Sequence, residues 1–166
     1  MKLAAPITPC LWFDNDAKEA AEFYVSVFPN SKIGKIAYYP DTGKEIHGMD
    51  AGKVLTVEFT INGQTFTALN AGPQFKFTEA VSFQLACETQ KEIDYFWDKL
   101  REGGGEEGPC GWLKDRFGLS WQVFPAMMNK ILSEGSQDEI KRVMDAFMKM
   151  KKFIVADIEA ARRKAA

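Results

Sequence analysis

The residues best suited to acid–base chemistry are Glu58 and His47, the single histidine of the chain. Glu58 falls in a run where polar and apolar residues alternate, so it is predicted to lie opposite the apolar face of a strand. His47 lies in a stretch rich in glycine and aspartate, between Glu45 and Asp50. A carboxylate or an imidazole in such a place can accept a proton from a substrate. For each residue the alternative is a solvated or ion-paired side chain.

A second set of candidates consists of aromatic, hydroxyl and amide side chains on the presumed inner face of the predicted strands. Flat apolar walls with a few hydrogen-bonding groups suit a planar or amphipathic small molecule. These candidate ligand-binding residues are Trp12, Thr67, Leu69, Ser82, Gln84, Trp112, Gln122 and Phe124. The aromatic residues would supply contact area, while the hydroxyl and amide groups would orient the ligand. Such a set predicts binding, and does not by itself make a catalyst.

The three cysteines, Cys10, Cys87 and Cys110, are odd in number and widely spaced. This pattern favours a reducing compartment and argues against a disulfide scaffold. Cys10 and Cys87 alternate with apolar residues and are predicted to lie in the core. For Cys110, in the turn-like sequence PCGW, a reactive thiol and a buried small residue both remain open.

Composition and charge exclude several classes of protein. The chain has 166 residues, of which 46% are hydrophobic and 27% charged, with a formal net charge of −2. These values are typical of a globular domain, and nothing in them indicates nucleic acid as a partner. The basic residues near the C-terminus are expected to be solvated on a charged helix. Neither a secretion signal nor a run long enough to span a membrane is found, so we expect a cytoplasmic protein with no membrane partner.

A hairpin in the sequence from Cys110 to Pro125 organises the elements around these candidates. It is predicted to turn at Phe117 and Gly118, with two strands whose side chains alternate. Leu119, Trp121 and Val123 would face one way, and Ser120, Gln122 and Phe124 the other. Residues 62–73 have the same build around Asn62 and Gly63. Superposing Gly63 on Gly118 places Thr67 opposite Gln122.

The two halves of the chain repeat one order of elements. The first half predicts a strand at 7–13 interrupted at Pro9, a helix after Asp16, and strands at 33–39, 54–61 and 65–70, with a loop at 40–52. The second half predicts a strand at 80–87, a helix from Gln90 that ends at three glycines, a short strand near 106–110, and the hairpin. Residues 126–134 and the stretch from Ser136 onward predict further helices, with one bent helix or two in the latter.

Two tandem βαβββ units, with WFDNDAKEAAEFYVSVFPNS near the start and CGWLKDRFGLSWQVFP at the end, make the chain similar to the vicinal oxygen chelate superfamily. It most resembles the PhnB-like branch, often labelled 3-demethylubiquinone-9 3-methyltransferase. The resemblance implies an α+β fold in which the two units form a cupped, incomplete barrel around a small-molecule cavity, usually within a homodimer. It covers about residues 5–125. We therefore expect a glyoxalase-like domain over 1–125 and a helical extension of the same domain over 126–166.

The resemblance also implies where relatives that use a metal hold it. The matching places here are Thr8 or Pro9, Thr67, Ser82 and Gln122. Hydroxyl groups and one amide are poor substitutes for the carboxylates and imidazoles that divalent metals need, so no metal and no cofactor are expected. Methyl transfer from S-adenosylmethionine is not expected either, because Gly103 to Gly105 follow a helix and do not precede one.

The sequence therefore predicts a metal-independent, homodimeric protein that binds a small molecule. The alternative is a lyase, isomerase or dioxygenase of the same superfamily, with Glu58 or His47 as acid and base and with any metal held unconventionally. A third hypothesis is an interaction module whose cup is filled by its own side chains.

Overall fold

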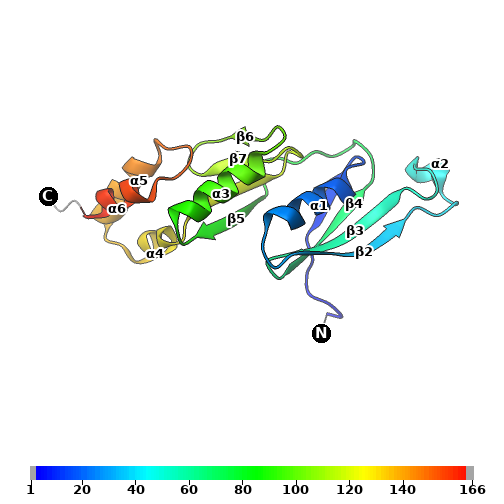
Figure 1. Cartoon of the computed structure of the whole chain (residues 1–166), viewed down its shortest axis with the longest axis horizontal. Helices are drawn as coiled ribbons and strands as arrows, with labels where there is room; N and C mark the ends of the chain where they lie inside the picture. Colours follow the sequence, from blue (N-terminus) through cyan, green and yellow to red (C-terminus); the bar gives the residue numbers. More distant parts are fainter. Residues whose placement is uncertain (1–2, 164–166) are drawn as a thin grey trace. The chain divides into compact units, whose positions relative to one another are not determined.

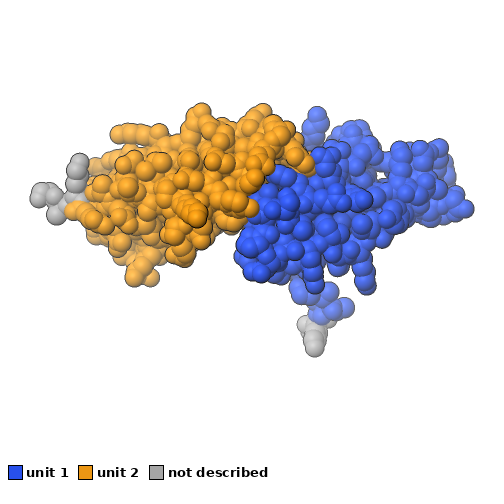
Figure 2. Space-filling view, in the orientation of Figure 1, with its two compact units in different colours: residues 1–76 blue, residues 77–166 orange. Residues whose placement is uncertain are grey.

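The computed structural model describes residues 3–163, and the chain forms two compact units, residues 1–76 and 77–166 (Figure 2). Each unit has a four-stranded sheet of its own. The helical extension predicted for residues 126–166 belongs to the second unit. Within the described residues, none of the helices combines the length and the apolar character that crossing a membrane requires.

The first unit has the predicted order of strands and helix. Its elements are β1 (Cys10–Phe13), α1 (Ala17–Val27), β2 (Lys32–Tyr38), α2 (Lys44–His47), β3 (Val54–Ile61) and β4 (Gln64–Asn70). The sheet order is β1-β4-β3-β2, with β1 parallel to β4. Strand β1 begins after Pro9 and lies at the edge of the sheet, which is where a proline interrupts least pairing. The predicted loop at 40–52 contains the short helix α2, which the sequence pattern did not predict.

The second unit repeats this arrangement. It contains β5 (Ser82–Cys87), α3 (Gln90–Arg101), β6 (Glu106–Glu107), β7 (Trp112–Lys114), β8 (Ser120–Pro125), α4 (Met127–Glu134), α5 (Gln137–Phe147) and α6 (Val155–Arg163). The sheet order is β5-β8-β7-β6, with β5 parallel to β8. The predicted α+β fold with tandem βαβββ units is confirmed, and neither sheet closes on itself. The last stretch forms two helices, α5 and α6, not one bent helix.

One helix covers one face of each sheet (Figure 1). The fully buried positions of α3 match those of α1, as the sequence repeat predicts: Ile93, Trp97 and Leu100 correspond to Ala20, Tyr24 and Val27. On the strands the residues that alternate with the buried ones point away from the helix. Each sheet therefore has a packed face and an open face.

The hairpin between β7 and β8 is built around Asp115. This residue is only 3% exposed. Its carboxylate accepts hydrogen bonds from the backbone N–H of Phe117 at 2.9 Å and of Leu119 at 3.1 Å, and from the indole Nε1–H of Trp121 at 2.9 Å. A buried carboxylate with several donors is a stable arrangement because each donor offsets part of its lost hydration.

The segment between α5 and α6 attaches the C-terminal helices to this sheet. The backbone N–H of Cys110 donates to Met150 O at 2.8 Å, and that of Gly111 donates to Lys151 O at 2.7 Å. Phe153, 4% exposed, packs directly over Gly111, where a side chain larger than hydrogen would collide with its ring. The segment is therefore docked by backbone pairing and by one buried aromatic ring.

Side chains at the start of α3 hold the same segment. Gln90 donates to Phe153 O at 3.0 Å and accepts from Val155 N at 2.8 Å. Lys152 pairs with Asp94 at 2.7 Å. The other described members of the basic cluster remain exposed, as expected of solvated side chains, and several of them pair with acidic residues of the same unit: Lys151 with Glu107, Arg162 with Glu139 and Arg163 with Glu159.

Candidate functional site

The open face of the second sheet carries two rows of side chains that cross the strands. The amide row consists of Gln84, Gln122 and Trp112, which lie opposite one another on β5, β8 and β7. The charged row consists of Ser82, Ser120, Lys114 and Glu106, on β5, β8, β7 and β6. The rows are two residues apart along each strand, so their side chains share one face.

Five predicted ligand-binding residues thus share this face: Ser82, Gln84, Trp112, Gln122 and Phe124. Gln122 is half-buried, and its Nε2 donates to Ser82 Oγ at 2.8 Å, which links the two rows. Gln84, directly opposite Gln122, is exposed. Phe124 continues the same face two residues beyond Gln122, opposite Ala86. The alternation that predicted this grouping is local to the strands, and the parallel pairing of β5 with β8 brings the residues side by side.

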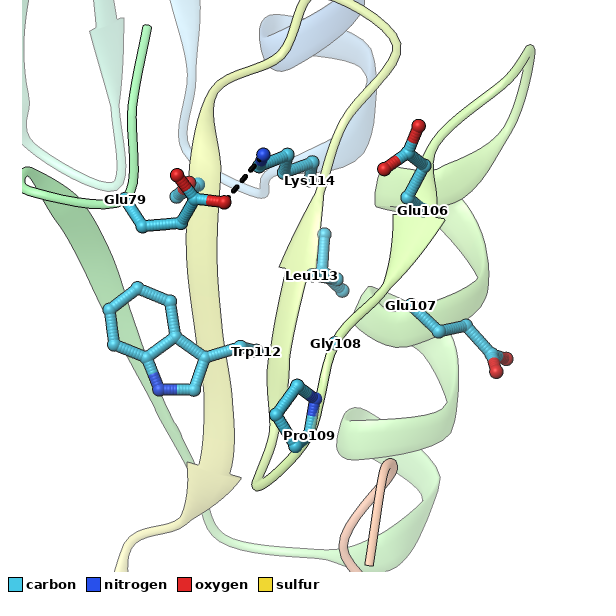
Figure 3. Close-up of a pocket in the computed structure, with 9 residues that line it drawn as sticks. Glu79, Glu106, Glu107, Gly108, Pro109, Trp112, Leu113 and Lys114 are labelled. Atoms are coloured by element: carbon cyan, nitrogen blue, oxygen red, sulfur yellow. Dashed lines mark ion pairs between the residues drawn. The ribbon is translucent and has the colours of Figure 1, made fainter.

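A cavity of about 320 Å³ lies beside Trp112 (Figure 3). Its size is at the lower end of the range typical of small-molecule sites. The lining residues are Glu79, Glu106, Glu107, Gly108, Pro109, Trp112, Leu113, Lys114 and Ser120. Of the residues predicted to bind a ligand, only Trp112 contributes to it. The remaining predicted residues of this unit continue the open face beyond the lining.

An ion pair crosses this cavity. Lys114 Nζ lies 2.6 Å from Glu79 Oε1, and Figure 3 shows the two side chains reaching toward each other in front of β8. The hydrogen bond from Lys114 lowers the pKa of the Glu79 carboxyl, and the same bond raises the pKa of the Lys114 ammonium. The charge of Glu106 raises the pKa of Lys114 further. Both partners of the pair are therefore charged at neutral pH.

The acidic residues of β6 differ in their surroundings. Glu107 points to the other side of the strand, where its carboxylate accepts from Arg101 at 2.8 Å and lies 3.2 Å from Lys151 Nζ. Glu106 lies opposite Lys114 in the register and forms no salt bridge among the described residues. The two neighbouring carboxylates thus have different roles: Glu107 ties the sheet to α3 and the C-terminal segment, whereas Glu106 faces the cavity.

Ser120 is a buried hydroxyl without a partner. It is 0% exposed, and its Oγ is the single buried side-chain polar atom without a hydrogen bond in the part of the chain that the structure describes. Leaving such a group unpaired costs about 1–3 kcal/mol. It lines the cavity, opposite Lys114 in the register.

Sequence reasoning missed four residues that line the cavity: Glu79, Glu106, Lys114 and Ser120. The alternation that selected Trp112 and Gln122 also puts Lys114 and Ser120 on the same face, so a signal for these two was present. Glu79 lies in the segment before β5, and no local pattern connects it with Lys114. Glu106 lies on the short strand predicted near 106–110, but no sequence pattern indicated that this strand pairs with β7 and places Glu106 opposite Lys114.

The open face of the first sheet holds the other predicted residues. Thr67 lies opposite Glu58 on one side and opposite Cys10 on the other. Glu58 is exposed and lies on the face away from α1, as predicted. Cys10 is exposed as well, so its predicted place in the core was wrong. The reason is the alternation of β1, in which Leu11 and Phe13 lie on the buried face and Cys10 lies on the opposite one.

Trp12 and Leu69 are neighbours on this same open face, opposite each other on β1 and β4. The indole Nε1–H of Trp12 donates to Gly72 O at 2.8 Å. Phe75 contacts the indole edge to face, with ring centroids 4.9 Å apart. The segment after β4 therefore covers part of Trp12 and leaves Phe75 exposed.

His47 has both ring nitrogens engaged within its own loop. Nδ1 accepts from the backbone N–H of Met49 at 3.1 Å, which places the ring proton on Nε2, 3.2 Å from Thr42 O. The ring also contacts that of Tyr39 in a tilted arrangement, with centroids 4.6 Å apart and an interplanar angle of 37°. The two hydrogen bonds link the residues on either side of α2 and favour a structural role for His47. Its action as a general base stays a prediction.

The remaining thiols and the metal positions give no chemical centre of their own. Burial raises the pKa of the Cys87 thiol to about 11, so it is protonated at neutral pH and was correctly predicted to lie in the core. Cys110 is half-buried. Over residues 3–163, no three or more His, Cys, Asp or Glu side chains lie close enough together to hold a metal ion. At two of the positions implied by the resemblance, Ser82 and Gln122 bond to each other.

Two tandem βαβββ units with open sheets define the class: this is the fold of the vicinal oxygen chelate superfamily. The family described as 3-demethylubiquinone-9 3-methyltransferase matches residues 5–124. The chain belongs to this family. No curated protein matches the chain significantly.

Solved structures agree with this placement. The PhnB protein from Bacillus cereus is 35% identical over 74% of this chain and 100% of its own, with a TM-score of 0.62. Protein PA1353 from Pseudomonas aeruginosa is 19% identical over 72% of this chain and 96% of its own, with a TM-score of 0.57. The fosfomycin resistance protein FosX from Mesorhizobium loti is 10% identical over 80% of this chain and 100% of its own, with a TM-score of 0.55. The last two likenesses concern the fold alone.

Proposed function

We propose that this protein binds a small organic molecule on the open face of its second sheet, and that it does so without a metal. The observation that carries the proposal is the cavity of about 320 Å³ beside Trp112, whose neighbour across the sheet is Gln122. An indole wall with a few fixed polar groups is the usual composition of a small-molecule site. Gln122, held by Ser82, is the residue expected to orient the ligand.

Metal independence is supported by the chemistry of the donors. Ser82, Thr67 and Gln122 offer hydroxyl and amide oxygens, which compete poorly with water for a divalent transition metal. Elemental analysis of the purified protein tests this part: we expect far less than one equivalent of zinc, nickel, manganese or iron. One equivalent of any of these metals would refute it.

The binding proposal is tested with the double variant Trp112→Ala/Gln122→Ala. We expect small molecules that co-purify with the wild type to be missing from the variant in native mass spectrometry. We also expect thermal shifts produced by a library of planar and amphipathic metabolites to disappear. Tyr95→Ala/Gln137→Ala, two exposed residues outside the cavity lining, is the matched control. Unchanged shifts in the first variant would refute the proposed site.

The alternative is a lyase, isomerase or dioxygenase that uses Glu58 as acid and base. One observation favours it: the Glu58 carboxylate is exposed on the open face of the first sheet, directly opposite Thr67. Turnover lost in Glu58→Gln, with ligand binding retained, would support this second function. The homodimer implied by the resemblance remains part of the proposal, and light scattering in solution tests it.

A further inference from the structure

We propose that the cavity beside Trp112 takes an organic cation, namely an amine carried on an aromatic or apolar body. This inference rests on the proposed function, because the cavity lies on the same open face, and it adds the chemical class of the ligand. Three features of the lining lead to it: a net negative charge, a buried hydroxyl without a partner, and an aromatic ring.

The charge of the lining is not balanced. It contains three carboxylates, Glu79, Glu106 and Glu107, and one ammonium group, that of Lys114. Glu107 is neutralised on the other side of its strand by Arg101 and a lysine of the C-terminal segment. Lys114 pairs with Glu79 at 2.6 Å. Lys114 also interacts with Glu106, but one ammonium cannot balance both carboxylates, so the lining keeps a net negative charge that a ligand with a single positive charge would cancel.

The hydrogen-bonding groups of the lining also favour a cationic ligand. Ser120 Oγ is fully buried, lines the cavity and has no partner. The Ser120 hydroxyl can donate or accept, whereas the carboxylates of Glu79 and Glu106 in the same lining can only accept. An ammonium group offers three donors and no acceptor, so it complements these acceptors. A carboxylate or phosphate ligand could accept from Ser120 but would be repelled by the carboxylates of the lining.

The aromatic wall completes the site. Figure 3 shows the indole of Trp112 and the side chain of Glu79 on the same side of the strands. The face of an indole attracts a cation through the negative charge of its π system, and it also buries the apolar body of the ligand. A charged amine can therefore bury its aromatic or aliphatic body against the ring and place its charge among the carboxylates of the same lining.

Three probes that share one aromatic body and differ in charge test the inference on the full chain. They are phenethylamine (positive), 2-phenylethanol (neutral) and 3-phenylpropionate (negative). We expect phenethylamine to bind at least about tenfold more tightly than the other two in isothermal titration calorimetry, the difference that about one charge-assisted hydrogen bond makes.

Variants of Glu106 and Ser120 extend the test to the lining residues. Glu106→Gln should weaken phenethylamine binding about tenfold, whereas Glu134→Gln, the same change at an exposed site outside the lining, should leave it unchanged. Ser120→Ala should weaken binding and at the same time raise the melting temperature, because it removes a buried hydroxyl that has no partner in the free protein. A purely structural role for Ser120 would not give this combination.

The results that overturn the inference are distinct from those that overturn the proposed function. Equal binding of the three probes, a preference for 3-phenylpropionate, no binding of phenethylamine, or full binding by Glu106→Gln would each refute the cation site. None of these would touch the proposed function. That function fails only if the Trp112→Ala/Gln122→Ala variant keeps its ligand-dependent thermal shifts.

Discussion

The two units share one topology but satisfy the start of their covering helix in different ways. In the first unit, Asn70 at the end of β4 accepts a hydrogen bond from Ala17 N at 2.8 Å, so a side chain from the sheet caps α1. Asp16 occupies the N-cap position of α1, but its side chain makes no cap bond. In the second unit, the position that matches Asn70 is Pro125, which has no such group.

The second unit caps its helix locally. Thr89 Oγ1 accepts from Glu92 N at 3.2 Å, and the Glu92 carboxylate accepts from Thr89 N at 3.0 Å, which is a capping box. The same fold therefore tolerates a cap that depends on the sheet and a cap that the helix supplies itself. The cap from Asn70 couples α1 to the sheet, whereas the capping box of α3 does not depend on β8.

The hairpin turns differ in the opposite sense. In the first unit, Asn62 and Gly63 turn the chain with positive φ angles of 45° and 85°, and the side-chain contact to this turn is the exposed bond from Asn62 N to Ser31 Oγ at 3.3 Å. In the second unit, the turn depends on the buried carboxylate of Asp115. Each unit thus has one locally determined feature and one that depends on contacts distant in the sequence.

The largest effect is expected from Asp115→Ala. The change leaves the N–H groups of Phe117, Leu119 and Trp121 without their acceptor inside the protein, and we expect a loss of about 3–5 kcal/mol in the free energy of unfolding. In the matching turn of the first unit, Asn62→Ala should cost about 1 kcal/mol, for the positive φ angle alone. Chemical denaturation measures both. Equal losses would show that the two turns do not differ as described.

The helix caps give the next largest effect. Asn70→Ala removes the acceptor for Ala17 N and the donor to Val54 O, and we expect a loss of about 2–3 kcal/mol. Thr89→Ala, at an exposed cap, should cost about 1 kcal/mol. Amide hydrogen exchange separates the two: Asn70→Ala should speed exchange at the start of α1 and in β3, whereas Thr89→Ala should affect α3 alone. Exchange confined to α1 in the first variant would contradict the coupling of helix and sheet.

The smallest effect concerns pH and the C-terminal segment, which only the second unit carries. The hydrogen bond from Lys152, and a second from Gln90, lower the pKa of Asp94 below its ordinary 3.8. Because the folded pKa is the lower one, the pair stabilises the docked segment above the ordinary pKa, and this contribution is lost as the pH falls through the folded value. For such a partly exposed pair we expect less than about 1 kcal/mol.

Amide exchange of Phe153 and Val155 between pH 5 and about pH 3, corrected for the intrinsic rate, measures this effect. Asp94→Asn should remove the pH dependence. Asp50→Asn is the matched control, because Lys44 lowers the pKa of Asp50 in the same sense within the first unit. If the two variants behave alike, the pair with Lys152 does not stabilise the docking.

The sequence by itself determined the elements, their order and their duplication. Alternation of apolar residues and helical spacing are repeated along each element, so Val54–Ile61, Gln90–Arg101 and the hairpin could be predicted within a few residues. The open face of each sheet followed from the same alternation, and Trp112, Gln122 and Ser82 were grouped correctly on it. Cys10 was misplaced because its apolar neighbours outweighed its position in that alternation.

Only the tertiary structure decided which polar groups meet. The burial of Asp115, the cap from Asn70, and the cavity with Glu79, Glu106 and Ser120 each join donors and acceptors from segments with no pattern in common. The hydrophobic effect is carried by many residues and depends on area, so a periodic sequence is enough to predict it. A hydrogen bond or an ion pair requires two particular atoms within about 3 Å, and folding alone brings such atoms together.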